Sequence, residues 1–398
     1  MSGIASPFTK TELLPQEEKL ELKKRKGELF IGLPKERSYQ EKRVCLTPDA
    51  ISNLTANGHR VLVERNAGKD AGFSDAAYSE AGAQLTSSTD KVFACPLILK
   101  VEPPTEEELA LMNPQTILLS ALQIKTQNKE YFQQLAAKHI TALAFEYIKN
   151  KEGIFPIVTA LSEIAGTASI LIAADLLATP HGKGIIFGNV AGVPPLNIVI
   201  IGAGTVGRFA ARTALGLGVN PKIFDQSLTK LRELQNFVKH PVYTSTLQPN
   251  TLLKSLKRAD VVIGAVRGKD RTPIVISETM VENMKTGSII VDVSIDMGGC
   301  AETTEVTTHE NPTSSKFGVV HYGVPNLPSR YPRSSSICLS NILTPYLLHI
   351  GEEGGLENTL RFDKGLRNGL YSYHGVLTSR SVAKWFNLEY RDINLLIF

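Results

Sequence analysis

A glycine-rich turn near the middle of the chain carries the clearest chemical signal. Residues 197–201 form an apolar run, typical of a buried parallel strand, and lead into Gly202, Gly204 and Gly207. In that order, the glycines permit a tight turn, let the backbone approach a pyrophosphate, and let the next helix pack on the sheet. Asp225 ends the next apolar run about 20 residues later, where a carboxylate accepts hydrogen bonds from an adenosine ribose.

Strand, glycines, helix, strand and acid in this order predict a dinucleotide site. The acid favours NAD over NADP, because a carboxylate repels the 2′-phosphate of NADP. The predicted contacts of this motif are Gly202, Gly204, Thr205, Val206, Gly207 and Asp225.

Polar residues that follow apolar runs form a second set of candidates. Ligands of open parallel sheets bind outside the carboxyl ends of the strands, so residues at those ends should converge. The rule selects Lys35, Glu36, Lys100, Gln123 and Glu146 in the first half of the chain, and Val266, Arg267, Asp296 and Asn326 in the second.

Three charged residues suit chemistry on a small substrate. Lys100 can stabilise charge on a substrate carbonyl oxygen, although a solvent-facing lysine at a strand end is an equal alternative. Arg43 can clamp a carboxylate with two hydrogen bonds, although an isolated arginine is more often a surface residue. Asp296 precedes two glycines and can relay a proton or cap a helix. His309 and His321 lie in the same part of the sequence, and we assign a catalytic role to neither.

The elements that must position these residues alternate along the chain, which predicts an α/β fold. Apolar strand patterns and helical patterns alternate from residue 29, which is typical of mostly parallel sheets with helices on both faces. We expect two Rossmann-like, doubly wound domains with a cleft between them. The expected division is an N-terminal extension at 1–28, a flavodoxin-like substrate domain at 29–157 plus about 330–398, and an NAD-binding domain at 158–329. The expected strands are 29–33, 59–63, 97–99, 116–119, 141–145, 197–201, 222–224, 261–263, 288–293 and 319–322.

Composition restricts the class of protein. The 398 residues are 42% hydrophobic and 21% charged with a net charge of +4, which is ordinary for a soluble globular protein and argues against nucleic-acid or membrane binding. The N-terminus lacks the apolar core of a signal peptide, and no apolar stretch of transmembrane length is free of charge. Cys45, Cys95, Cys300 and Cys338 lack metal-ligand spacing, so we expect reduced thiols, no metal and a cytoplasmic location.

Several ordered blocks of sequence resemble the alanine dehydrogenase and pyridine-nucleotide transhydrogenase family. The resemblance covers nearly all of residues 29–350. Its blocks are 32–36, 43–48, 192–207, 295–303, 307–309 and 326–328, of which the last three resemble alanine dehydrogenases specifically.

The resemblance implies NAD-linked oxidative deamination of L-alanine to pyruvate and ammonia, and the reverse reaction, in a homohexamer. It implies that Arg43 holds the substrate carboxylate, that Lys100 bonds the substrate carbonyl or carboxylate, and that Asp296 assists proton transfer and contacts the cofactor. Asn326 is placed near the nicotinamide and the substrate. The resemblance implies further cofactor contacts for Ser162 and Lys230, and the strand-end rule adds Val266 and Arg267, whose loop is shorter and more charged than is usual in the family.

One departure from the family pattern concerns catalysis. Gln123 stands where alanine dehydrogenases usually carry a catalytic histidine, and an amide cannot shuttle a proton near neutral pH. Two alternatives therefore stay open: an NAD-binding, alpha-type subunit of a transhydrogenase, and a non-catalytic NAD-binding protein. The sequence leaves open the exact amino acid, the oligomer number and the role of the tail after Gly351.

Overall fold

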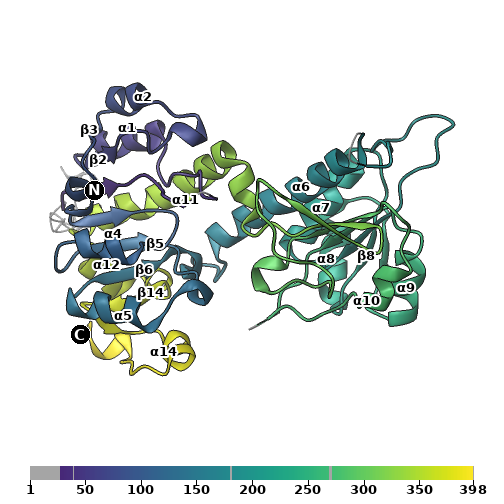
Figure 1. Cartoon of the computed structure of the whole chain (residues 1–398). Coiled ribbons are helices and arrows are strands. Elements are labelled where there is room, and N and C mark those ends of the chain that lie inside the picture. The colour runs from purple at the N-terminus through teal and green to yellow at the C-terminus, as the bar shows by residue number, and fades with distance from the viewer. Residues whose placement is uncertain (1–26, 39, 180–181, 269–270, 398) are drawn as a thin grey trace, which may run out of the picture.

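The chain folds into two α/β lobes, each built on its own twisted sheet (Figure 1). The computed structural model describes residues 27–38, 40–179, 182–268 and 271–397. The predicted N-terminal extension therefore lies almost entirely outside the described residues. Both sheets are dominated by parallel pairs, which confirms the predicted fold class.

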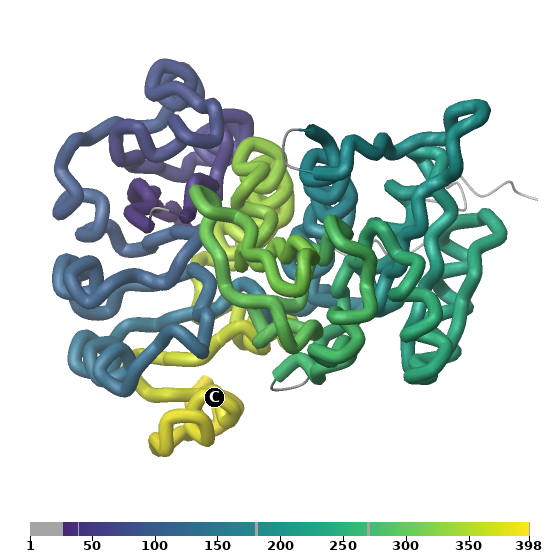
Figure 2. The backbone as a smooth tube through the Cα atoms, turned by 45° about the vertical axis from the view of Figure 1, so that its right-hand side comes forward, coloured from purple at the N-terminus to yellow at the C-terminus, as the bar shows by residue number. Residues whose placement is uncertain are grey.

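The first sheet has eight strands in the order β15-β14-β6-β5-β4-β1-β2-β3. Strands β1 to β6 are parallel, whereas β14 is antiparallel to β6 and β15 is antiparallel to β14. The C-terminal tail thus joins the lobe formed by the N-terminal half of the chain, as its yellow trace shows in Figure 2. The strands are β1 (Phe30–Leu33), β2 (Arg60–Glu64), β3 (Gln84–Thr86), β4 (Leu97–Leu99), β5 (Ile117–Ser120), β6 (Thr141–Ala144), β14 (Leu370–Tyr373) and β15 (Val376–Leu377).

Short helices with side-chain caps surround the first sheet. Thr47 accepts a hydrogen bond from Ala50 N at the start of α1, and Pro48 occupies the first turn. Thr105 and Glu108 form a capping box at the start of α4. The helices are α1 (Pro48–Ala56), α2 (Asp75–Glu80), α3 (Thr89–Phe93), α4 (Glu106–Leu111), α5 (Lys129–Ala137), α12 (Leu356–Phe362), α13 (Lys364–Arg367) and α14 (Arg380–Phe386).

The second sheet has seven strands in the order β12-β13-β11-β10-β7-β8-β9, and only β12 is antiparallel to its neighbour. Every residue of β7, β10 and β11 is buried, which explains why these strands read as apolar runs, with Asp292 at the end of β11 as the exception. The strands are β7 (Ile198–Ile201), β8 (Lys222–Phe224), β9 (Tyr243–Ser245), β10 (Val261–Gly264), β11 (Ile289–Asp292), β12 (Thr313–Lys316) and β13 (Val319–Tyr322). The helices are α7 (Thr205–Gly216), α8 (Leu228–Val238), α9 (Pro249–Leu256) and α10 (Glu278–Glu282).

Two long helices, α6 (Pro156–Leu177) and α11 (Pro332–Glu352), lie between the lobes and pack on each other (Figure 1). Within the described residues, α6 is the one helix long and apolar enough to cross a membrane by length and composition. It packs on α7, α11 and β11, so it is a core helix of this fold.

Both long helices begin with a proline in the first turn, where proline needs no amide partner. In α11 the early turns are rich in serine, and their hydroxyls bond to the first lobe: Ser336 Oγ accepts from Val44 N and Ser340 Oγ accepts from Thr47 N. These polar helical turns have no apolar pattern that would reveal them in the sequence.

Candidate functional site

The glycine-rich turn between β7 and α7 has two positions, 202 and 207, at which only glycine fits. Gly202 has φ +112°, and a Cβ there would lie 2.2 Å from Ala265 O. A Cβ on Gly207 would lie 1.8 Å from Gly202 O, because α7 packs directly against the turn. At Gly204, by contrast, a Cβ would meet nothing within 4 Å. The backbone is therefore open to a ligand at the middle glycine alone.

The start of α7 fits the pyrophosphate of a dinucleotide. Gly204 is the N-cap and supplies no side-chain hydrogen bond, so side chains leave the amides of the first turn, at Thr205 and Val206, uncapped. Such amides and the helix dipole attract phosphate. Asp225 Oδ2 accepts from Ala203 N at 2.7 Å and Oδ1 accepts from Ser227 N at 2.8 Å, which fixes the carboxylate beside the turn. The residues present therefore fit the predicted NAD.

Lys100 is not a solvent-facing lysine. Its residue is 3% exposed, and its Nζ lies 2.8 Å from Glu108 Oε2 and 3.4 Å from Glu36 Oε2. Burial alone would lower the pKa of Lys100, but the two carboxylates outweigh it and raise the pKa. Burial raises the pKa of Glu36 to about 7 despite the adjacent ammonium. Lys100 is thus a buried cation in a mainly acidic surrounding.

Arg43 is also buried, and Glu41 holds it. Arg43 Nε donates to Glu41 Oε1 at 2.7 Å, and Nη2 donates to Oε2 at 2.5 Å. Burial opposes both charges, but their attraction outweighs it, so the pKa of Arg43 is raised and that of Glu41 is lowered. Nη1, the remaining guanidinium nitrogen, has no hydrogen-bond partner in the described part of the chain. It is the group that a substrate carboxylate can bind.

Asn326 and Asp296 come from the second lobe and meet this pair. Asn326 Nδ2 donates to Glu41 Oε2 at 3.1 Å, and Asn326 N donates to Asp296 Oδ1 at 2.7 Å. Asp296 lies in the 3-10 turn η4 (Ile295–Met297) after β11, and Asn326 precedes the 3-10 turn η5 (Leu327–Arg330). The structure therefore brings Arg43, Asn326 and Asp296 together from segments that are far apart in the sequence.

Asp296 is accessible to solvent but enclosed by groups from both lobes. This enclosure raises the pKa of its carboxyl, and the Asn326 amide, Arg43 and Lys125 partly oppose the rise. An accessible carboxyl with a raised pKa suits proton exchange with a substrate and water.

Gln123 occupies a left-handed backbone conformation after β5, with φ +46°. Glu146 Oε1 accepts from Leu122 N at 2.8 Å and from Gln123 N at 3.3 Å, and so fixes this backbone. The 3-10 turn η2 (Ile124–Thr126) follows, and its Lys125 is close enough to Asp296 to influence its charge. Gln123 therefore lies on a loop that faces the second lobe.

The remaining predicted cofactor residues lie on the second lobe or at its border. Val266 N donates to Ser294 Oγ at 3.0 Å, and Arg267 is exposed beside it. Ser162 lies half-buried on α6, and Lys230 is exposed on α8. No hydrogen bond among the described residues links these four to Lys100 or Asp296. Their contact with a cofactor stays a prediction.

The two histidines make structural contacts. His321 is buried and its Nε2 lies 2.7 Å from Thr303 Oγ1, while His309 Nε2 lies 2.8 Å from Ser329 Oγ. Burial lowers the pKa of both rings.

Sequence reasoning missed Glu41 and Glu108, which are the acids that hold the two cations. Glu108 has a signal in the sequence, because the spacing from Thr105 to Glu108 is that of a capping box. That pattern predicts a helix start, and it carries no information about the contact with Lys100. Glu41 has only its position two residues before Arg43 as a signal.

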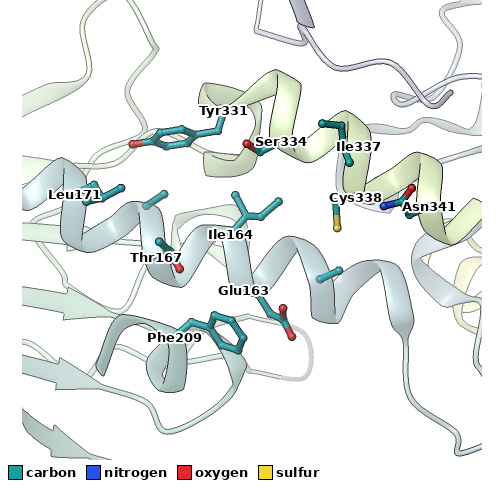
Figure 3. A pocket seen from close by; sticks show the side chains of 12 residues that line it. Glu163, Ile164, Thr167, Leu171, Phe209, Tyr331, Ser334, Ile337, Cys338 and Asn341 are labelled. Atoms are coloured by element: carbon teal, nitrogen blue, oxygen red, sulfur yellow. The ribbon is translucent and has the colours of Figure 1, made fainter. Parts of the chain in front are cut away.

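A cavity of about 590 Å³ lies elsewhere, between α6 and α11 (Figure 3). Apolar side chains such as Ile164, Leu171 and Ile337 dominate its lining, with Glu163 and Asn341 at its border. None of the charged residues described above lines it. The cavity is thus separate from the candidate site.

Comparisons with known proteins show the family to which the chain belongs. The family model "Alanine dehydrogenase/PNT, N-terminal domain" matches residues 32–165, and the corresponding C-terminal domain model matches residues 168–380. This chain belongs to the alanine dehydrogenase/PNT family. It is 39% identical over 365 residues to an alanine dehydrogenase of Bacillus subtilis, which covers 91% of this chain and 96% of that protein. It is 38% identical over 366 residues to an alanine dehydrogenase of Staphylococcus epidermidis, with 91% and 98% covered.

Solved structures of family members share the fold. One titled L-alanine dehydrogenase superposes with a TM-score of 0.85 at 36% identity, and covers 90% of this chain and 99% of that one. A transhydrogenase from Sinorhizobium meliloti superposes with a TM-score of 0.76 at 21% identity, with 88% and 99% covered. At that identity, the second match supports the fold alone.

Proposed function

We propose that this family member catalyses the NAD-dependent oxidative deamination of L-alanine to pyruvate and ammonia, and the reverse reaction. The observation that carries the proposal is the meeting of Arg43, Asn326 and Asp296 between the two lobes. Sequence and structural similarity to alanine dehydrogenases over nearly the whole chain supports the proposal. The transhydrogenase alternative has less support, because the structural match to that protein has lower identity.

The buried Arg43 binds the substrate carboxylate through Nη1 in this proposal. Its other two guanidinium contacts belong to Glu41, so Nη1 has a fixed direction before substrate arrives. A pre-oriented guanidinium loses less conformational entropy on binding than a mobile one. Lys100 adds positive charge that stabilises the developing oxyanion of the substrate.

Proton transfer is assigned to Asp296. The glycine-rich turn at Gly202, Gly204 and Gly207, together with Asp225, would hold NAD, which would supply the hydride acceptor for the substrate carbon. Asp296 takes a proton from the substrate amine or from attacking water and returns one to the leaving ammonia. Its raised pKa and its access to solvent support both steps.

Gln123 orients water or substrate by hydrogen bonds and moves no proton. The reaction therefore depends on Asp296 and water to a greater degree than it would with a histidine at position 123. A protein that binds NAD without turnover is the second candidate function, and Gln123 is the observation that favours it. We further propose a cytoplasmic homohexamer as the working form.

NADH absorbance tests the proposal. The purified protein is incubated with NAD and, separately, with L-alanine, glycine, L-serine or L-lysine. We expect NADH to form fastest with L-alanine, and NADP to support far less turnover. NADH binding without turnover on any amino acid would favour the second candidate instead. An Arg43→Lys variant serves as a control, because it keeps the positive charge but loses the bidentate hydrogen bonding to Glu41.

A further inference from the structure

One buried carboxylate connects the two lobes at the candidate site. Glu41 is 2% exposed and accepts four hydrogen bonds: from Arg43 N at 2.9 Å, from Arg43 Nε and Nη2, and from Asn326 Nδ2 at 3.1 Å. Arg43 belongs to the first lobe, and Asn326 lies 285 residues further along the chain than Glu41. The carboxylate therefore has donors on both of its oxygens and from both lobes.

The contact extends from Asn326 to Asp296. Asn326 uses its side chain for Glu41 and its backbone N–H for Asp296, so the two acids are joined through a single residue. Asn326 has φ +52°, and the two hydrogen bonds fix its backbone N–H on Asp296 and its side-chain amide on Glu41. A displacement of Glu41 would therefore move the donor that orients Asp296.

A neighbouring hydrogen bond makes the same connection between the lobes. His309 N donates to Gln40 Oε1 at 3.3 Å, one residue before Glu41. Residues 40 and 41 thus contact two separate segments of the second lobe. Of these two residues, Glu41 is the one that also bonds to a cation, Arg43.

We propose that Glu41 is a positioning residue that joins the carboxylate-binding Arg43 to the Asn326–Asp296 segment, so that the substrate clamp and the proton-transfer group are placed by the same approach of the two lobes. This inference rests on the proposed function. It assigns Glu41 no contact with substrate or cofactor. Its role is to fix the direction of Nη1 on Arg43 and the position of Asn326.

The pattern of donors and acceptors explains why a carboxylate is required. Arg43 and Asn326 both present N–H donors to Glu41, and the carboxylate has only acceptors. In Glu41→Gln, one acceptor becomes an NH₂ donor, which faces another donor from Arg43 or Asn326. At least one of the contacts is then lost, although the size of the side chain is unchanged.

The experiment exchanges the two groups. Glu41→Gln and Asn326→Asp are made singly and together, since the double variant keeps the total charge and lets glutamine donate to aspartate. We expect each single variant to raise the KM for L-alanine by about tenfold to a hundredfold, the usual range for losing a hydrogen bond to a charged group. We expect the double variant to recover part of that loss, because its amide at position 41 can donate to position 326 while Arg43 Nη2 still faces that amide. The Kd for NADH should change by less than about threefold in Glu41→Gln, because the glycine-rich turn is elsewhere.

Glu102→Gln is the matched control. Glu41, Lys100 and Arg43 are near enough to shift the pKa of Glu102, but Glu102 bonds to Ser38, so its substitution removes a nearby charge and leaves the contact between the lobes intact. We expect its KM for L-alanine to stay within about threefold of wild type.

Three outcomes would overturn the inference. The first is a double variant no better than the worse single variant, the second is an equal effect of Glu102→Gln, and the third is an unchanged KM in folded Glu41→Gln. Asn326→Asp alters the same contact from the half-buried side, so it keeps the test decisive if Glu41→Gln does not fold. A wild-type protein that forms no NADH with any amino acid would instead overturn the proposed function itself.

Discussion

The buried Glu36 beside Lys100 should make the stability of the protein depend on pH. In the unfolded chain the pKa of a glutamate is 4.5, and burial raises it to about 7 in the folded protein. Above pH 7 the buried Glu36 carboxyl is ionised in the folded protein, and this buried charge destabilises the folded state. Each tenfold change in proton affinity is worth about 1.4 kcal/mol, so full ionisation costs about 3 kcal/mol of folding stability.

The direction follows from which state keeps the proton. Between pH 4.5 and about 7 the folded protein holds the Glu36 proton while the unfolded chain has lost it, so stability falls as pH rises. Glu36→Gln removes this dependence because an amide does not titrate. From about pH 5.5 to about pH 8.5, the variant should therefore gain about 2 kcal/mol relative to wild type.

Urea denaturation at the two pH values, with both proteins at equal concentration, measures this difference. Glu107→Gln is the control, because Glu107 is an exposed acid on the nearby helix α4 and has the same chemistry. The two denaturation slopes must agree before the free energies are compared. A difference between Glu36→Gln and wild type that stays constant with pH, or that shrinks as pH rises, would refute the reasoning.

Five further substitutions test the site and the fold. Asp225→Ala should weaken NADH binding by about tenfold to a hundredfold through lost ribose contacts, as measured by calorimetry, and an unchanged Kd would contradict the assigned cofactor site. Lys100→Ala should abolish turnover while NADH still binds, and wild-type turnover in that variant would remove Lys100 from the mechanism. Gln123→His should raise turnover if position 123 limits proton transfer, and equal turnover would leave that work to Asp296. Gly207→Ala should lower the melting temperature by several degrees or prevent folding, because its Cβ would meet Gly202 O at 1.8 Å, whereas Gly204→Ala, with no neighbour within 4 Å, should melt like wild type.

Strands that are buried on both faces could be predicted from the sequence, because burial itself requires an apolar run. β7, β10 and β11 are of this kind. β9 and β12 could not be predicted in the same way. Both are edge strands with no fully buried residue, and β12 reads Thr-Ser-Ser-Lys.

The residues of the candidate site likewise differ in whether the sequence could predict them. The rule about strand ends selected Lys100, Asp296 and Asn326, because topology fixes where the chain emerges from a sheet. Their partners are set by tertiary packing, which the local pattern does not encode. Glu108 reaches Lys100 only because the first turn of α4 lies beside the end of β4, and Glu41 reaches Asn326 only because the lobes meet.

The left-handed backbone at Gln123 and Asn326 restricts which substitutions each position can accept over evolutionary time. Both residues have positive φ, at +46° and +52°, and both are followed by a 3-10 turn. Asparagine, aspartate and histidine tolerate this conformation comparatively well, whereas β-branched residues do not. An exchange between glutamine and histidine at position 123 therefore costs little backbone energy. Selection at this position then acts on what the side chain does in the reaction. The backbone conformation disfavours the β-branched residues valine, isoleucine and threonine, independently of their effect on the reaction.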